Sequence, residues 1–190
     1  MSKCICVFSA SSEDVDIAYF DAATMLGRRI AEAGWSMIFG GGMVGLMGAM
    51  ARAVHAEGGR VVGVIPEGLN RPGVAYDAAD ELIVTETLRE RKAIMDERAD
   101  AFIALPGGFG TLEEIIEVLA LKQLRYHNRP VVFLNTEGFY DPLLNFFEHQ
   151  VERQFVKPEH RRLYYVADTS EEAMNHIRKY AGAEVPEKFV

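Results

Sequence analysis

The chain has 190 residues, of which 49% are hydrophobic and 25% are charged, a composition typical of one globular domain with a substantial core. Its formal net charge of -8 argues against a nucleic-acid backbone or an anionic membrane as partner, because both attract basic surfaces. No run approaches the roughly 20 apolar residues of a membrane span, and residues 1–8 are too few for a signal-peptide core. We therefore expect a single cytoplasmic domain over residues 1–190, with neither a membrane nor a nucleic acid as partner.

Short β-rich runs alternate with amphipathic helical patterns, which is typical of a mostly parallel α/β sheet with helices on both faces. A first helix is predicted over residues 17–33, with Gly34 at its C-terminal cap, and a second over residues 45–57. Later helices are expected to begin near Thr87, Thr111, Tyr140 and Ser170. The predicted strands are residues 4–8, 36–39, 61–65, 82–84, 101–105, 131–134 and 163–166.

The longest stretch without a regular pattern covers residues 66–80, directly after a predicted strand. Long loops in compact domains are often functional, so this segment is either a lid or binding loop or a solvated connection. Cys4 and Cys6 are the only cysteines, and the five histidines form no cluster with them. The sequence therefore predicts no metal site, and we also expect no cofactor.

Small residues follow three predicted strands where the chain turns toward a helix. Ser9 opens a serine-rich turn, residues 40–42 are three glycines, and residues 106–111 read Pro-Gly-Gly-Phe-Gly-Thr. Ligands of open α/β sheets bind beyond the carboxyl ends of the strands, and glycine lets backbone amides approach an anion. Neither glycine run has the spacing of a dinucleotide fingerprint or a P-loop. One such loop often marks only a tight turn, but three together favour a site for a small nucleoside monophosphate.

Two interpretations of Glu114 remain open from the local pattern. Thr111 and Glu114 have the spacing of a capping box, in which the carboxylate bonds back to the start of its helix. Alternatively, the phosphate lies on the backbone amides and Glu114 faces the sugar. In that position a negative charge stabilises an oxocarbenium-like centre or orients a water molecule.

A basic group lies at the start of the helix expected from Thr87. Arg89, Arg91 and Lys92 stand at the helix end where the macrodipole disfavours cations. Thr87 and Glu90 supply a capping box there, so the basic residues do not act as caps. They form either a salt-bridged surface patch or part of the nucleotide site.

With these residues in view, the chain resembles the Lonely Guy family of cytokinin riboside 5′-monophosphate phosphoribohydrolases over residues 4–151. The most specific shared element is Pro-Gly-Gly-x-Gly-Thr-x-x-Glu, here residues 106–114. Residues 40–48, 63–66 and 90–92 also match that family in order and spacing.

The resemblance implies a Rossmann-like homodimer that hydrolyses a purine nucleoside 5′-monophosphate, cytokinin-type or AMP, without a cofactor. The products would be the free base and ribose 5-phosphate. Arg91 and Glu114 would be the catalytic pair, and the helices that carry them are expected at the dimer interface. The substrate-binding residues would be Ser9, Gly41, Gly42, Lys92, Gly107, Gly108, Phe109, Gly110 and Thr111.

Two positions depart from the family pattern. Gly73 stands where many relatives have a glutamate, and Leu88-Arg89 stand where Met-His precedes x-Arg-Lys. Both positions lie near the expected base and sugar.

A non-catalytic alternative is a binding protein. Molybdenum-cofactor carrier proteins look similar around the glycine loops and bind a phosphorylated pterin without turnover. The pairing of Arg91 with Glu114 in the complete motif favours the enzyme. Proteins of this type are sometimes labelled lysine decarboxylases, but nothing in the sequence indicates a pyridoxal phosphate site.

Overall fold

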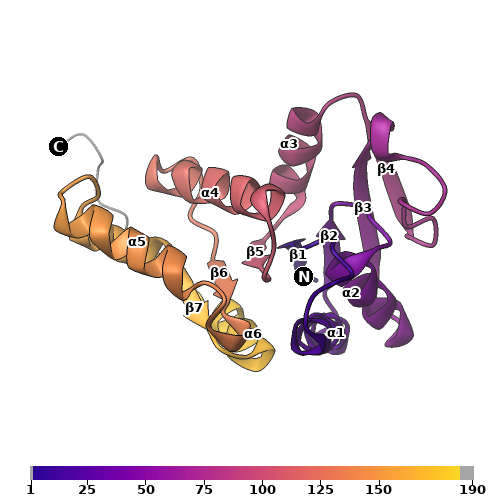
Figure 1. Ribbon diagram of the computed structural model, residues 1–190, viewed down its shortest axis with the longest axis horizontal. Coiled ribbons are helices and arrows are strands. Elements are labelled where there is room, and N and C mark those ends of the chain that lie inside the picture. Colours follow the sequence, from indigo (N-terminus) through magenta and orange to yellow (C-terminus); the bar gives the residue numbers. More distant parts are fainter. Residues whose placement is uncertain (1, 185–190) are drawn as a thin grey trace.

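The computed structural model describes residues 2–184, so residue 1 and residues 185–190 of the predicted domain lie outside the described part. Seven parallel strands form one sheet in the order β4-β3-β2-β1-β5-β6-β7, with helices around it (Figure 1). This confirms the predicted α/β architecture. The strands are β1 (Cys4–Phe8), β2 (Ser36–Phe39), β3 (Val61–Pro66), β4 (Glu81–Thr85), β5 (Ala101–Ala104), β6 (Val131–Leu134) and β7 (Tyr165–Ala167).

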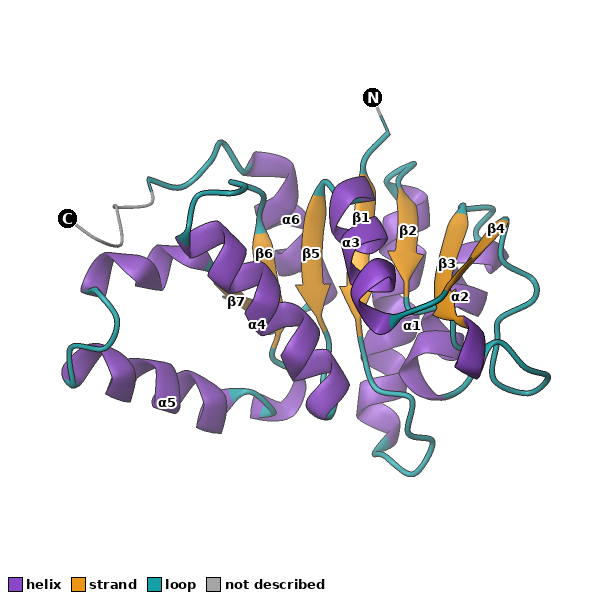
Figure 2. Ribbon diagram, turned by 90° about the horizontal axis from the view of Figure 1, so that it is seen from above, coloured by secondary structure: helices purple, strands orange, loops and turns teal. Residues whose placement is uncertain are grey.

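Two layers of helices cover the two faces of the sheet, as Figure 2 shows with α3 and α4 in front and α1 and α2 behind. Ile5 and Val7 of β1 pack into the core beneath α1 and α2, whereas Cys6 and Phe8 pack beneath α3 and α4. This alternation follows from the two-residue period of a strand. Within the described residues, no helix is long and apolar enough to cross a membrane. The helices are α1 (Ile17–Glu32), α2 (Gly45–Ala56), α3 (Leu88–Arg98), α4 (Phe109–Gln123), α5 (Asp141–Glu152) and α6 (Ser170–Lys179).

The direction of strand addition reverses between β1 and β5. The chain builds β2, β3 and β4 outward on one side of β1, and α3 then returns it so that β5 pairs on the other side, with Phe8 opposite Ala104. In open α/β sheets the crevice at such a reversal, beyond the carboxyl ends of the strands, is the usual ligand site. The predicted serine turn and the 106–111 turn both begin there.

Side-chain caps begin three of the six described α-helices, α1, α3 and α6. The Thr87 hydroxyl accepts a hydrogen bond from the Glu90 N–H at 3.1 Å, which confirms Thr87 as the N-cap of α3, while the Glu90 carboxylate accepts the N–H of Glu86, the residue before the cap, at 3.0 Å. Gly34 follows α1 with a φ of 68°, a left-handed conformation that suits glycine at a helix end. The start predicted for α4 at Thr111 is wrong, because the helix begins at Phe109 with Gly108 as its N-cap.

The last predicted strand is also shifted. Leu163 ends a short 3-10 helix, Pro158–Leu163, and β7 covers only Tyr165–Ala167. Leu163 is apolar because it packs into the core beneath α4 and α5, not because it belongs to the strand.

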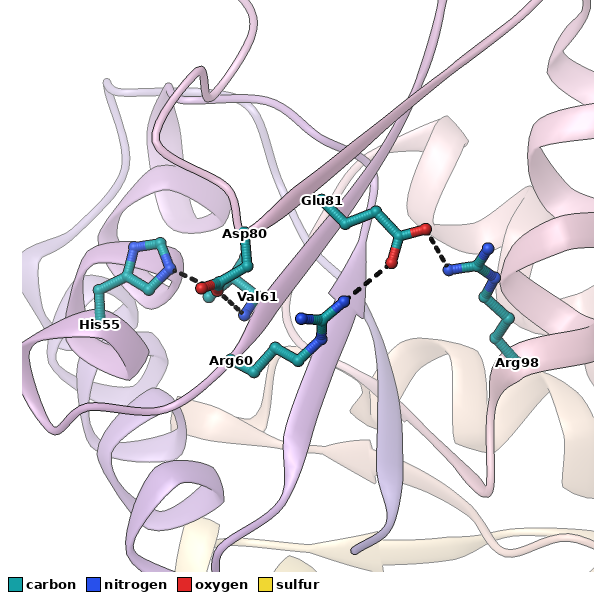
Figure 3. Close-up of polar contacts among 6 residues, drawn as sticks. All are labelled: His55, Arg60, Val61, Asp80, Glu81 and Arg98. Carbon is teal, nitrogen blue, oxygen red and sulfur yellow. Dashed lines mark hydrogen bonds and ion pairs between the residues drawn. The ribbon is translucent and has the colours of Figure 1, made fainter.

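Residues 66–80 return from the carboxyl end of β3 to the amino end of β4 and are anchored near that end. The Asp80 carboxylate accepts the Val61 N–H at 2.7 Å and contacts His55 Nε2 at 3.1 Å (Figure 3). In the next residue, Glu81 forms ion pairs with Arg60 and Arg98 at 2.9 and 2.7 Å. The segment is therefore not a free solvated connection, although residues 67–73 are exposed.

Candidate active site

Backbone hydrogen bonds join the three small-residue turns at the reversal between β1 and β5. The Ala10 N–H donates to the Pro106 carbonyl at 3.3 Å, which links the first turn to the third. The Leu46 N–H donates to the Ala10 carbonyl at 3.1 Å, which links the start of α2 to the first turn. The structure thus brings together Ala10 and Pro106, which are 96 residues apart in sequence.

Residues 107–111, here called the 107–111 loop, comprise the turn before α4 and the first three residues of that helix, where free N–H groups and the helix dipole favour an anion. Gly107 is required by contact, because a Cβ there would lie 2.1 Å from Thr111 Oγ1. Cβ atoms at Gly108 and Gly110 would meet no atom within 4 Å, so the backbone faces open space at both positions. Phe109 between them is 93% exposed. The loop therefore presents accessible amides, as a phosphate site requires.

Ser9 lies at the carboxyl end of β1 and is 9% exposed. Its hydroxyl oxygen is buried and has no hydrogen-bond partner among residues 2–184. A buried unsatisfied polar atom is costly, and such atoms mark places where a ligand or water completes the bonding. This observation supports the predicted role of Ser9 in substrate binding.

The backbone groups of Gly41 and Gly42 bond to the 66–80 segment, whereas we expected them to contact the substrate phosphate. The Gly41 carbonyl accepts the Tyr76 N–H at 2.8 Å, and Gly42 forms an isolated antiparallel bridge with Ala75. Gly41 has a φ of 72° and packs closely on Ile65, so a side chain there would be strained. These glycines therefore anchor the 66–80 segment to the site, and their contact with substrate stays a prediction.

Arg91 and Glu114 meet beside these loops. Arg91 Nη1 donates to Glu114 Oε1 at 2.6 Å, and the two side chains are only 12% and 10% exposed. Arg91 Nε also donates to the Val64 carbonyl at 2.9 Å, which fixes the guanidinium at the end of β3. Gly40 makes room for this arrangement, because a Cβ there would lie 2.0 Å from Arg91 Nη2.

The capping interpretation of Glu114 is wrong. Because α4 begins at Phe109, Glu114 lies in its second turn and bonds to Arg91 of α3 instead of to its own helix start. Burial raises the pKa of the Glu114 carboxyl above its usual value, and the Arg91 charge offsets this only in part. Glu114 therefore combines a strong cation contact with a raised affinity for protons, a combination common at catalytic sites.

Lys92 is held by carboxylates of α4. Its ammonium contacts Glu113 and also lies 2.6 Å from Glu117 Oε2. Burial lowers the pKa of Lys92, but the hydrogen bonds to the two carboxylates outweigh that effect and leave the pKa above its usual value. The lysine thus joins α3 to α4 next to the pair, and its predicted contact with substrate stays a prediction.

Tyr140 supports the site and was not identified from the sequence. Its buried hydroxyl donates to the Leu105 carbonyl at 2.5 Å, just before the 106–111 turn. Burial raises the pKa of this phenol far above its usual value, so the hydroxyl keeps its proton. Asn135 accepts the Tyr140 N–H at 2.7 Å and fixes its backbone. No local motif signals this role, because the contact joins residues 35 positions apart.

Two hollows flank α4. The α3–α4 groove, of about 260 Å³, is lined by Glu114, Lys92 and residues on both helices. The α4–α5 hollow, of about 410 Å³, is lined by neither Arg91 nor Glu114, so its larger size does not make it the reaction site. Within residues 2–184 there is no group of three or more His, Cys, Asp or Glu side chains suited to a metal ion.

Comparison with known proteins agrees with the geometry. The model of a family described as "Possible lysine decarboxylase" matches residues 47–177. The chain is 43% identical over 176 residues to the "Probable cytokinin riboside 5'-monophosphate phosphoribohydrolase LOGL5" of Oryza sativa subsp. japonica, covering 93% of this chain and 72% of that protein. It is 42% identical over 176 residues to the "Cytokinin riboside 5'-monophosphate phosphoribohydrolase LOG2" of Arabidopsis thaliana, covering 93% and 83%.

Solved structures with the same fold include molybdenum-cofactor proteins. One, the molybdenum cofactor binding protein of Rippkaea orientalis, aligns with a TM-score of 0.72 at 24% identity over 94% of this chain and 96% of that chain. The Chlamydomonas rheinhardtii Moco Carrier Protein aligns with a TM-score of 0.68 at 26% identity over 94% and 97%. These similarities confirm the Rossmann-like fold, whereas the two sequence relatives are named as phosphoribohydrolases. By its family match and its 43% identity to a named phosphoribohydrolase, the chain belongs to the Lonely Guy family.

Proposed function

We propose that this protein hydrolyses the N-glycosidic bond of a purine nucleoside 5′-monophosphate, either a cytokinin riboside monophosphate or AMP. The observation that carries the proposal is the buried pair of Arg91 and Glu114 beside the 107–111 loop. Membership of the Lonely Guy family, whose relatives are named for this activity, supports it.

In the proposed complex the 5′-phosphate lies on the amides of the 107–111 loop, near the Ser9 hydroxyl. Glu114 follows that loop by one turn of α4, so its carboxylate is near the ribose. As the bond between C1′ and the base nitrogen breaks, positive charge develops on the sugar ring, and a carboxylate there stabilises it. Water then adds to C1′, the base takes up a proton, and ribose 5-phosphate and free base are released. Arg91 holds Glu114 in place through the 2.6 Å contact.

The alternative is a carrier that binds a phosphorylated pterin or nucleotide without turnover. The fold shared with the Moco Carrier Protein favours it. The two functions differ in the fate of AMP. We expect chromatography of AMP incubated with the protein to show free adenine and ribose 5-phosphate, whereas recovery of intact, bound AMP would support the carrier.

The same assay tests the phosphate site. Adenosine lacks the group that the 107–111 loop is proposed to bind, so we expect it to be a far poorer substrate than AMP. Equal turnover of adenosine and AMP would remove the phosphate contact from the mechanism.

We further propose that the protein is a single nucleotide-binding domain over residues 1–190 that acts as a cytoplasmic homodimer. The α4–α5 hollow supports the dimer, because no residue of α5, all of which is described, is fully buried although its Leu143, Phe146 and Phe147 line an apolar surface. Light scattering of the active protein tests the dimer, and cell fractionation tests the location. An active monomer at working concentration would contradict the dimer.

A further inference from the structure

The α3–α4 groove has the size and walls of a site for one heterocycle. Its volume of about 260 Å³ is just below the roughly 300–1,000 Å³ of sites that enclose a whole drug-sized ligand. Its apolar lining includes Ala93, Val118 and Leu121, together with Phe8 and Phe102, which are only 5% and 0% exposed. Glu114 lines the groove at the carboxyl edge of the sheet, where the proposed ribose lies. A purine attached to that ribose has an apolar surface to lie against.

Almost every charged group that lines the groove already has a partner. Lys92 pairs with Glu117, and Glu114 pairs with Arg91. Asp96 pairs with the Arg129 guanidinium at 2.7 Å. These charges balance within the protein, so they leave little net charge for a ligand to meet.

Arg89 is the exception. It lines the same groove, and no hydrogen bond or ion pair joins its guanidinium to any other residue in the described range, 2–184. It lies in the first turn of α3, where the helix dipole disfavours a cation. An unpaired guanidinium in that place offers a fork of N–H donors to a ligand with adjacent acceptors.

The two kinds of purine differ in what they present to such a fork. A 6-oxopurine carries two adjacent acceptors, O6 and N7, which is the arrangement that arginine binds with two hydrogen bonds. Adenine carries an acceptor at N7 but a donor amino group at C6, so arginine makes only one good bond to it. We propose that Arg89 extends the reaction to 6-oxopurine nucleoside 5′-monophosphates, GMP and IMP, by binding O6 and N7 of the base in the α3–α4 groove. This inference rests on the proposed hydrolysis.

The test compares kcat/KM for GMP, IMP and AMP in the wild type and in Arg89 variants. We expect the wild type to use GMP and IMP at least as well as AMP. Arg89→Ala should lower kcat/KM for GMP and IMP at least about tenfold, the size expected for losing one bidentate base contact, and change AMP much less. Arg89→Gln should shift the preference toward AMP, because a glutamine amide matches N6 and N7 of adenine. Arg98→Ala removes the same charge from α3 outside the groove and should leave the preference unchanged.

Three outcomes would overturn the inference. If the wild-type protein hydrolyses AMP but neither GMP nor IMP, the inference is overturned and the proposed function stands. An Arg89→Ala variant that loses activity equally on all three nucleotides would assign Arg89 to the shared phosphate or sugar. If no monophosphate is hydrolysed, the proposed function fails and equilibrium binding decides the inference. Tighter binding of GMP than AMP that depends on Arg89 would then support the contact of Arg89 with the base but not its part in a reaction, and equal binding would overturn the contact as well.

Discussion

Two arginine–glutamate contacts in this protein have nearly the same length but opposite consequences. Near the amino ends of β3 and β4, Glu81 contacts Arg98 at 2.7 Å, with side chains 34% and 43% exposed (Figure 3). At the candidate site, Glu114 contacts Arg91 at 2.6 Å, with side chains 10% and 12% exposed. The hydrogen bond from Arg98 lowers the pKa of Glu81, whereas burial raises the pKa of Glu114.

The comparison shows that burial, not contact distance, decides what an ion pair does. Water solvates both charges of the exposed pair, so the pair contributes little to the free energy of unfolding. In the buried pair both ions have lost water, and each depends on the other for compensation. A desolvated carboxylate interacts strongly with a positive charge that develops nearby, and the proposed reaction develops such a charge on the sugar ring.

The largest expected effect comes from Arg91→Ala. Without the guanidinium, Glu114 loses its orientation and its charge partner, so we expect turnover of AMP to fall roughly 10³-fold. Steady-state kinetics measures this loss. Arg89→Ala should affect AMP much less, and a larger effect of Arg89→Ala than of Arg91→Ala would show that the register of the motif on α3 is assigned wrongly.

Arg91→Ala also tests the comparison of the two ion pairs through its effect on the free energy of unfolding. Arg91→Ala leaves a buried carboxylate unpaired and should lower the free energy of unfolding by about 3 kcal/mol in urea titrations near neutral pH. Arg98→Ala breaks an exposed pair and should cost less than about 1 kcal/mol. Equal costs for the two variants would show that burial does not distinguish the pairs.

Glu114→Gln should cost at least about a hundredfold in turnover, as expected for loss of a group that handles charge or a proton. Glutamine keeps the shape and can still accept the bond from Arg91, so we expect AMP binding to stay close to wild type. Glu113→Gln is the matched control, because that side chain points about 100° away around α4. Full activity of Glu114→Gln would exclude a catalytic role and favour the carrier function.

The smallest expected effects concern how the free energy of unfolding changes with pH, and they have opposite signs for Glu114 and Glu81. The pKa of folded Glu114 is raised above 4.5, so its contribution to stability is present below pH 4.5 and is lost as the pH rises through the folded pKa. The pKa of folded Glu81 is lowered from 4.5, so its contribution is present above pH 4.5 and is lost as the pH falls through the folded pKa.

Urea titrations of Glu114→Gln and Glu81→Gln across this range test the two signs. The unfolding free energy of Glu114→Gln should gain on the wild type as the pH rises above 4.5. That of Glu81→Gln should approach the wild type as the pH falls below 4.5. Slopes of the same sign would contradict the assigned pKa directions.

Much of the fold was predictable from local patterns. Apolar runs located β1, β2 and β6 with the bounds that the structure has, and Thr87 with Glu90 located the start of α3. The start of α4 was misplaced because Gly110, a residue of low helix propensity, lies inside the first turn of the helix, which begins at Phe109. The strand predicted from Leu163 was misplaced because an apolar residue packs into a core from a 3-10 helix as readily as from a strand.

The sequence by itself determined the α/β class, the three small-residue turns and the candidacy of Arg91 and Glu114, because these depend on spacing along the chain. Only the tertiary structure decided that Glu114 pairs with Arg91 instead of capping α4, that Gly41 anchors residues 66–80, and that Arg89 faces a groove without a partner. Each of these facts depends on atoms from distant segments and on how much water reaches them. Burial and long-range contacts are properties of the folded chain, and no local spacing encodes them.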